Sequence, residues 1–221
     1  MIAGESVLRR FPMRSPGGGV LRLKFETCWK RSSVFVAFVL CAISQAHGAG
    51  DLYVDLSNPA CPGAGTSVDP FCTIQGAIQA STHGDIIHVA PGIYTEHVIV
   101  DGLDISILAT SGSYTTTIDA NGSGSVLTFR NGGWTTPLVE GFTLTGGTGT
   151  EQRGGGVYID GASPTLRNCV ITNNHTNGRG GGVYARNQST PTLESCELNL
   201  NSTEIDGGAI FQSGGSLSLV N

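Results

Sequence analysis

The feature that most constrains this chain is a fixed interval. Pro137, Pro164 and Pro191 lie 27 residues apart, and a similar segment begins at each of them: PLVEGFTLTGG, PTLRNCVITNN and PTLESCELNLN. Repetition at a period of about 20 to 50 residues is typical of a solenoid, in which each turn buries its apolar face only against its neighbours. The sequence therefore predicts stacked turns rather than a globule with one enclosed core.

The agreement extends to apolar positions within each turn. Three sets keep the 27-residue interval: Val139, Leu166 and Leu193; Phe142, Cys169 and Cys196; Leu144, Ile171 and Leu198. These sets predict stacked columns that face the interior. A second marker, Gly-Gly followed by an apolar pair, begins at Gly155, Gly181 and Gly207, at an interval of 26 residues. The difference between the two intervals indicates that the loops gain or lose one residue.

Short strands explain the turns better than helices do. The segments 157–159, 165–166 and 169–172 are brief and rich in β-branched residues, and Gly, Asn, Ser and Pro interrupt them. This pattern is typical of three strands in each turn of a parallel β-helix. Gly141, Asn168 and Ser195 share one column between two strands, where a tight bend needs the left-handed backbone that Gly and Asn adopt most readily. The missing helical pattern excludes ankyrin, tetratricopeptide and leucine-rich repeats.

Residues 1–49 have the pattern of a targeting segment. Basic residues up to Arg31 precede an apolar run from Val34 to Ile43, and cleavage is expected after Ala46 or Gly48. The apolar run is shorter than the roughly 20 residues that a membrane-spanning helix needs. The chain is therefore expected to be exported in soluble form, either secreted or held at the cell surface, with no membrane insertion by this segment.

Charge divides the chain at the same place. Residues 1–49 hold 7 Lys+Arg and 2 Asp+Glu, whereas residues 50–221 hold 5 Arg, no Lys and 15 Asp+Glu. The exported part is therefore strongly acidic. Binding to a phosphate backbone requires clustered cations, so the composition argues against nucleic acid as a partner and against docking on an anionic membrane.

Two cysteine pairs lie in the exported part. Cys61 and Cys72 bracket a short Pro/Gly-rich loop, CPGAGTSVDPFC, and are expected to form a disulfide in an exported chain. Cys169 and Cys196 occupy one apolar column and are expected to stack inside the solenoid as free thiols. Neither pair has the CxxC or His spacing of a zinc site, so no metal site is predicted.

Residues 50–84 are expected to form an N-terminal cap. Within it, residues 73–81 (TIQGAIQAS) place Ile74, Ala77 and Ile78 on one stripe of a short helix that can cover the open end of the first turn. Strands are predicted at 86–89, 97–100 and 103–108, with a turn at Pro91-Gly92. Residues 85–221 leave room for about five turns. The last of these stops in mid-turn, which indicates a fragment of a longer protein.

The opening segment, DLYVDLSNPACPGAGTSVDPFCTIQGAIQAS followed by GDIIHVAPGIYTEHVIV, resembles the start of pectin-lyase-like right-handed parallel β-helix proteins. The later motifs, CVITNN with GGGVY and CELNLN with GGAIF, are similar to polymorphic outer-membrane-protein repeats. The resemblance covers residues 51–221 and implies an all-β, right-handed parallel β-helix. It implies no single activity, because the family includes polysaccharide lyases, hydrolases, esterases, adhesins and passenger domains.

Glu140, Arg167 and Glu194 form one outward column at the 27-residue interval. Adjacent turns lie about 4.8 Å apart, so the two carboxylates would be about 9.6 Å apart, just beyond the roughly 6.5 to 9.5 Å of an inverting glycosidase. The arginine between them would also keep both acids ionised, whereas a general acid needs a raised pKa. The column therefore predicts a ladder of ion pairs, and no catalytic residue is assigned.

Arg153 and Arg179 precede the two GGGVY motifs, and Tyr158 and Tyr184 lie beside them. Two stacked guanidinium groups could grip the carboxylates of an acidic polysaccharide, and the tyrosines could stack on sugar rings. These four residues are the predicted carbohydrate-binding patch. A structural interpretation stays open, because a solenoid aligns like residues by construction and Arg179 can pair with Asp206. The direction of the tyrosines also stays open.

A polysaccharide lyase of this fold would bring calcium-binding acids together with a Lys or Arg. Residues 50–221 contain no Lys, and Asp101, Asp104 and Asp119 are scattered among predicted turns, where Asp is a common turn former. The histidines share no column, and no GxSxG, HExxH or P-loop motif is present. No cofactor is expected, except Ca²⁺ if the protein is a lyase.

These observations predict the N-terminal part of an exported β-helix protein. Its expected role is a rigid cell-surface or secreted scaffold, or an adhesin-like module whose ligand is a polysaccharide or cell-surface glycan. Two alternatives stay open: a polysaccharide lyase or hydrolase whose catalytic turns lie beyond residue 221, and a purely structural spacer.

Overall fold

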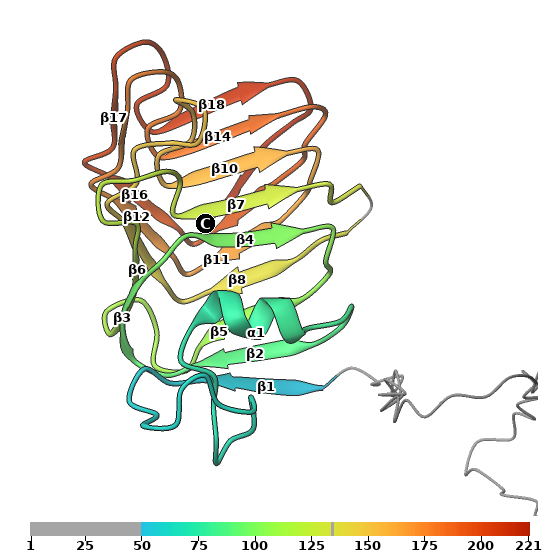
Figure 1. Cartoon of the computed structure of the whole chain (residues 1–221). Helices are drawn as coiled ribbons and strands as arrows, with labels where there is room; N and C mark the ends of the chain where they lie inside the picture. The colour runs from blue at the N-terminus through green and yellow to red at the C-terminus, as the bar shows by residue number, and fades with distance from the viewer. Residues whose placement is uncertain (1–49, 134) are drawn as a thin grey trace, which may run out of the picture. The chain divides into compact units, whose positions relative to one another are not determined.

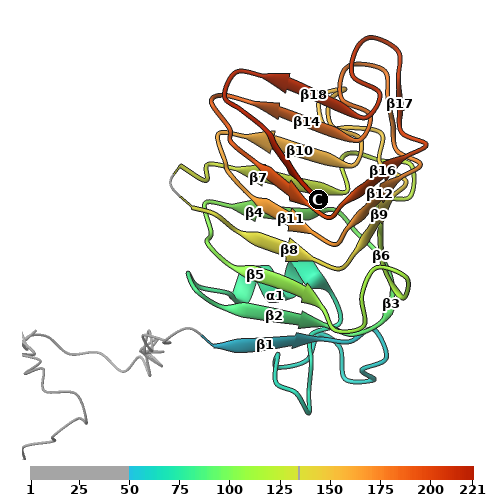
Figure 2. The ribbon, with the colours of Figure 1, turned by 180° about the vertical axis from the view of Figure 1, so that it is seen from behind.

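The computed structural model describes residues 50–221 except Trp134, and the expected targeting segment lies outside this range. The described chain winds into a parallel β-solenoid of about five turns, with one short helix near its N-terminal side (Figure 1 and Figure 2). The predicted fold class is confirmed. Within the described residues, no helix has the length and apolar character needed to cross a membrane.

Each full turn contributes one strand to each of three long sheets. The first sheet contains β1 (Asp51–Val54), β2 (Ile86–Val89), β5 (Ser106–Ala109), β8 (Leu138–Glu140), β11 (Thr165–Arg167), β15 (Thr192–Glu194) and β19 (Ser218–Val220). The second contains β3 (Gly92–Thr95), β6 (Thr116–Asp119), β9 (Thr143–Thr145), β12 (Val170–Thr172) and β16 (Glu197–Asn199). The third contains β4 (Val98–Asp101), β7 (Leu127–Arg130), β10 (Val157–Asp160), β14 (Val183–Arg186) and β18 (Ile210–Ser213).

A short fourth sheet pairs β13 (His175–Thr176) with β17 (Ser202–Thr203). The predicted strands at 86–89, 97–100 and 103–108 correspond to β2, β4 and β5. The turn predicted at Pro91-Gly92 is confirmed as a bend at Pro91 but does not include Gly92, where β3 begins. Gly92 is already part of the parallel ladder, because it pairs with Thr116 of the next turn.

Apolar columns fill the interior between the sheets. Leu166 pairs in register with Val139 on one side and Leu193 on the other, and all three side chains are at most 2% exposed. Ile171 likewise pairs with Leu144 and Leu198 in the second sheet. The positions that recur at 27 residues are therefore confirmed as vertical stacks of neighbours.

The bend between the first and second sheets uses a left-handed residue in each of three turns. Gly141, Asn168 and Ser195 have φ angles of 81°, 51° and 50°, which confirms the predicted bend column. The ladder continues through the bend, because the Gly141 N–H donates to the Arg167 carbonyl and the Asn168 N–H to the Glu194 carbonyl, each at 3.0 Å. An ordered bend therefore fixes the angle between the two sheets.

The Gly-Gly marker is displaced by one residue in the last turn. β14 and β18 pair with Val183 opposite Ile210, which places Gly208, rather than the predicted Gly207, opposite Gly181. A Cβ on Gly181 would approach the Gly208 carbonyl oxygen to 2.6 Å. Glycine recurs here because the backbones of adjacent turns approach too closely for a side chain.

Helix α1 (Ile74–Ala80) lies next to β4, where a further strand of the third sheet would otherwise lie (Figure 1). Its buried residues are the predicted stripe, Ile74, Ala77 and Ile78. Thr73 caps the helix by accepting the Gly76 N–H at 3.1 Å. The carboxylate of Glu96 accepts the N–H groups of Ile74 and Gln75, each at 2.9 Å, so the next turn anchors the helix N-terminus.

The N-terminal edges of two sheets are hydrogen-bonded to other segments. The Gln75 amide accepts the Ile99 N–H at 2.7 Å and donates to the Ile99 carbonyl at 3.3 Å, which pairs the edge of β4. At β1, the Tyr53 N–H donates to the Gly65 carbonyl at 3.0 Å, and the Phe71 N–H donates to the Tyr53 carbonyl at 2.8 Å. Some of the backbone N–H and carbonyl groups at both edges are thus paired within the chain.

Replacement of Leu166 by Ala tests the central column. The substitution leaves a cavity between two turns, so we expect the free energy of unfolding to fall by about 2 to 5 kcal/mol. Urea unfolding followed by circular dichroism measures the change. Leu200→Ala is the matched control, because Leu200 is 75% exposed and its truncation removes little packing. Equal losses in the two variants would contradict the stacked core.

Candidate functional site

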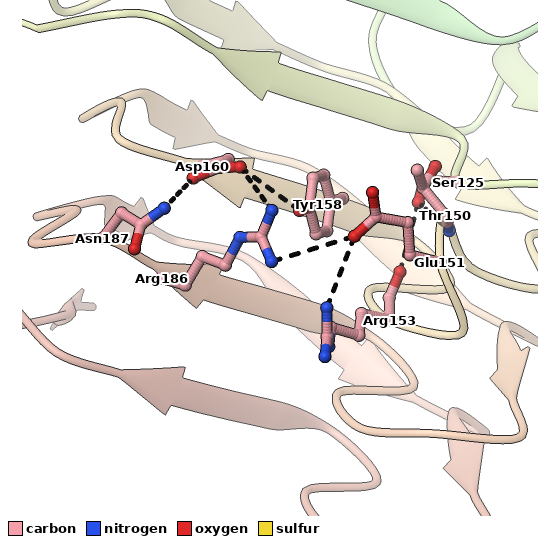
Figure 3. Close-up of polar contacts among 8 residues, drawn as sticks. All are labelled: Ser125, Thr150, Glu151, Arg153, Tyr158, Asp160, Arg186 and Asn187. Atoms are coloured by element: carbon pink, nitrogen blue, oxygen red, sulfur yellow. Dashed lines mark hydrogen bonds and ion pairs between the residues drawn. The ribbon is translucent and has the colours of Figure 1, made fainter.

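The predicted patch lies on the outer face of the third sheet. Side chains alternate along β10, so that Val157 and Ile159 belong to the core whereas Tyr158 and Asp160 face outward (Figure 3). The Tyr158 hydroxyl donates to the Asp160 carboxylate at 3.3 Å. Tyr184 is the direct partner of Tyr158 in β14. Both tyrosines therefore point away from the core, which settles the direction that the sequence leaves open.

Although they face outward, the tyrosines are covered by other side chains. Tyr158 is 4% exposed and Tyr184 is 5% exposed. Their rings stack with centroids 5.9 Å apart, and Tyr184 stacks on Phe211 at 5.5 Å. The guanidinium groups of Arg153 and Arg186 lie over the rings of Tyr184 and Tyr158, at 5.6 Å and 5.3 Å. Protein groups thus occupy much of the surface that a sugar ring would contact.

The two predicted arginines each have a carboxylate partner. Arg153 Nη1 lies 3.4 Å from the Glu151 carboxylate, and Arg179 Nε lies 3.2 Å from that of Asp206. The backbones of Arg153, Arg179 and Asp206 face one another in consecutive turns. The Arg179 guanidinium also lies 5.1 Å from the centre of the Phe211 ring. Stacking and ion pairing therefore hold both cations flat against the sheet.

A second column of charges runs along the same face. Asp101, Arg130, Asp160 and Arg186 occupy equivalent positions in β4, β7, β10 and β14. Arg130 Nε is 2.9 Å from Asp101 Oδ2, and Arg186 Nη2 is 2.7 Å from Asp160 Oδ2. The sequence prediction that Asp101 is an isolated turn former is wrong, because it ends β4 and pairs across the turns. The pairs are 29 and 26 residues apart, so a search at one interval does not reveal the column.

Asp160 and Arg186 are the best-connected members of this column (Figure 3). Asn187 Nδ2 donates to Asp160 Oδ1 at 2.5 Å, and Arg186 Nη1 is also 3.8 Å from the Glu151 carboxylate. The hydrogen bond from Arg186 lowers the pKa of Asp160 against the opposing effect of burial. Burial and the nearby Asp160 carboxylate raise the pKa of Tyr158 to about 12. At neutral pH Asp160 is therefore ionised, and Tyr158 keeps the proton that it donates to Asp160.

On the first sheet, Glu140, Arg167 and Glu194 form the predicted ladder. Arg167 pairs in register with both acids. Its Nη1 is 3.4 Å from Glu140 and its Nε is 2.7 Å from Glu194, and the hydrogen bond to Glu194 is the main cause of its raised pKa. The interpretation as a cross-turn ion-pair ladder is confirmed. Half-exposed pairs of this kind contribute little to stability.

The remaining chemistry-bearing residues lie apart. Cys61 and Cys72 form a disulfide in the loop that follows β1, and Cys169 and Cys196 are free thiols. His97 bonds the Ser125 carbonyl at 2.9 Å and lines a groove of about 560 Å³ between α1 and β4. Across residues 50–221 other than 134, no three His, Cys, Asp or Glu side chains gather closely enough to hold a metal ion.

The geometry defines a parallel β-helix scaffold whose third sheet carries a charged and aromatic outer face. In a comparison with protein-family models, the right-handed beta helix region matches residues 106–220, just over half of the chain. The chain belongs to this family. The match begins at the first residue of β5 and ends at the last residue of β19. Comparisons with curated proteins and with solved structures gave no match.

The lowered pKa of Asp160 predicts a loss of stability in acid. A carboxylate whose folded-state pKa lies below its unfolded value stabilises the fold above the unfolded pKa, about 3.9, and this contribution is lost as the pH falls through the folded pKa. We expect Asp160→Asn to be less stable than the parent chain at pH 6 and the difference to shrink below about pH 4. Urea unfolding between about pH 3 and about pH 7 measures this difference. A difference that does not change with pH would contradict the ion pair.

Proposed function

We propose that the protein is an exported β-helix scaffold whose third sheet binds an acidic polysaccharide or cell-surface glycan through Arg153 and Arg179. The observation that carries this proposal is the placement of two guanidinium groups in register on adjacent turns, each lying over an aromatic ring. Guanidinium groups recognise carboxylates by paired hydrogen bonds. A repeating polyanion is the ligand class whose carboxylates recur at regular intervals, as these two arginines recur in adjacent turns.

The solvent exposure of the two arginine side chains also supports this proposal. The side chains of Arg153 and Arg179 are 37% and 46% exposed. Arg179 donates to the Asp206 carboxylate through Nε at 3.2 Å, so its two Nη groups are the donors that we assign to the ligand. Tyr184 then orients the Arg153 guanidinium, and Tyr158 orients that of the neighbouring Arg186, instead of stacking on the sugar themselves. The proposal therefore keeps all four predicted residues and changes the role of the tyrosines.

The finer family assignment is also a proposal. The opening segment at 51–81 and the CVITNN, GGGVY and GGAIF motifs support a pectin-lyase-like protein with repeats of the polymorphic outer-membrane-protein type. In that setting a rigid, acidic solenoid would display the third sheet outside the cell. The ion-paired carboxylates of this face favour an adhesin-like module over a polysaccharide-cleaving enzyme, because arginine partners hold Asp160 ionised.

Binding to polygalacturonate tests the ligand class. We expect Arg153→Ala together with Arg179→Ala to weaken binding by roughly 100-fold or more, because each arginine loses at least one charge-assisted hydrogen bond worth about 1.5 to 3 kcal/mol. Isothermal titration calorimetry at low salt gives the affinity. Arg167→Ala is the matched control, since Arg167 has similar exposure but lies on the first sheet. Unchanged affinity in the double variant, or equal binding of a neutral galactan, would contradict the proposal.

Replacement of Asp206, whose carboxylate competes with a ligand for Arg179, should strengthen binding to polygalacturonate. Asp206→Asn frees the guanidinium of Arg179 from its ion pair, so we expect polygalacturonate to bind up to about fivefold more tightly, because an exposed pair is worth about 0 to 1 kcal/mol. The same titration measures the change. Weaker binding by this variant would indicate that Asp206 itself contacts the ligand.

Export through the N-terminal segment is a separate proposal. The basic stretch, apolar run and small residues of 1–49 support it, as does the Cys61–Cys72 disulfide, because disulfides persist in oxidising compartments. We expect the mature chain to begin at His47 or Ala49. N-terminal sequencing of protein secreted from an expression host tests this, and recovery of intact chain in the cytoplasm would contradict it.

A further inference from the structure

Two free thiols lie in one internal stack, in consecutive turns. The Asn168 N–H donates to the Glu194 carbonyl at 3.0 Å, and the Glu197 N–H donates to the Cys169 carbonyl at 2.9 Å. These bonds bracket Cys169 and Cys196 and keep them in register. Parallel neighbours are about 4.7 to 4.9 Å apart, which lies within the Cα–Cα range of about 4.4 to 6.8 Å for disulfides.

Each sulfur lies against the backbone of the neighbouring strands: Cys169 Sγ donates to the Arg167 carbonyl at 3.2 Å, and Cys196 Sγ donates to the Leu166 carbonyl at 3.3 Å. The interaction between the two thiol side chains is the largest influence on the pKa of each: it raises the pKa of Cys169 and lowers that of Cys196 to about 7. Cys169 is 1% exposed. Cys196 is half-buried and lines a hollow of about 300 Å³ with Leu198 and Ile210. Of the two cysteines, Cys196 is the more exposed in this structure, because it lies beside the last turn that the structure describes.

We propose that Cys169 and Cys196 form a second, oxidant-dependent disulfide that links consecutive turns of the solenoid. No third metal-ligating side chain gathers with them in the part of the chain that the structure describes, so the pair is suited to thiol–disulfide exchange rather than to a structural metal. A disulfide is uncharged, and it therefore fits an apolar interior that would disfavour two thiolates.

The exchange with a small-molecule disulfide such as oxidised glutathione proceeds in two steps. The Cys196 thiolate attacks one glutathione sulfur, the glutathione S–S bond breaks, and one glutathione leaves as a thiolate. Cys169 then loses its proton and attacks Cys196 Sγ, and the second glutathione leaves. The two cysteines are oxidised, the glutathione disulfide is reduced to two thiols, and the protons of the cysteines end on glutathione.

The test uses the full chain with Cys28→Ser and Cys41→Ser, so that the only unpaired thiols are the two in question. After equilibration with oxidised glutathione, acid quenching and alkylation, we expect both thiols to resist alkylation and the chain to have lost two hydrogen atoms. A non-reduced tryptic map should contain residues 168–179 linked to residues 187–221. The linked form should melt on the order of 5 to 10 °C higher than the reduced form.

Two single variants separate the roles of the sulfurs. Cys169→Ala should stop at a stable glutathione adduct on Cys196, whereas Cys196→Ala should remain unmodified because Cys169 is buried. Three results would each overturn the proposal: a persistent adduct on Cys196 in the chain that retains both thiols, two thiols that stay alkylatable, or a linked form that melts no higher than the reduced one. These readouts are independent of polysaccharide binding.

Discussion

The parallel hydrogen-bond ladder between consecutive turns is the constraint on which the rest of this molecule depends. It fixes the vertical spacing, and it keeps each apolar side chain above its equivalent, as Leu166 lies between Val139 and Leu193. Because the ladder continues through the left-handed bends at Gly141 and Asn168, sheets and corners share one register. Any side chain that recurs in sequence therefore becomes part of a column, whether the column is apolar, aromatic or charged.

The third sheet illustrates what such columns can do. Its outer face places a row of aromatic rings beside a row of alternating acids and arginines, and the guanidinium groups of Arg153, Arg179 and Arg186 lie over the rings. Each ion pair orients a guanidinium group, and the carboxylate of the pair offsets the positive charge of that group. The face is therefore ordered and nearly balanced in charge, and the polysaccharide binding that we propose would rest on many weak contacts with a regularly spaced polymer.

Much of this architecture could be predicted from the sequence, because the central turns keep nearly constant length. The columns of Leu166, Arg167 and Asn168 follow directly from the 27-residue interval. The predictions fail where loop length changes: the Asp101–Arg130 pair spans 29 residues, and the last Gly-Gly marker shifts by one. The cover over Tyr158 was also not predictable, because it depends on Arg186 reaching across from the next turn.

The N-terminal edges of the first and third sheets, at β1 and β4, are protected against pairing with other molecules. A side-chain amide, Gln75, occupies the backbone groups of Ile99 at one edge. A loop held by the Cys61–Cys72 bridge occupies those of Tyr53 at the other. A β-strand from another molecule thus finds no continuous row of free backbone groups at the β1 and β4 edges. Reduction of the Cys61–Cys72 bridge would loosen only the loop at the β1 edge. The first sheet would then be open to fibril-like strand pairing, whereas the β4 edge of the third sheet would stay paired with Gln75.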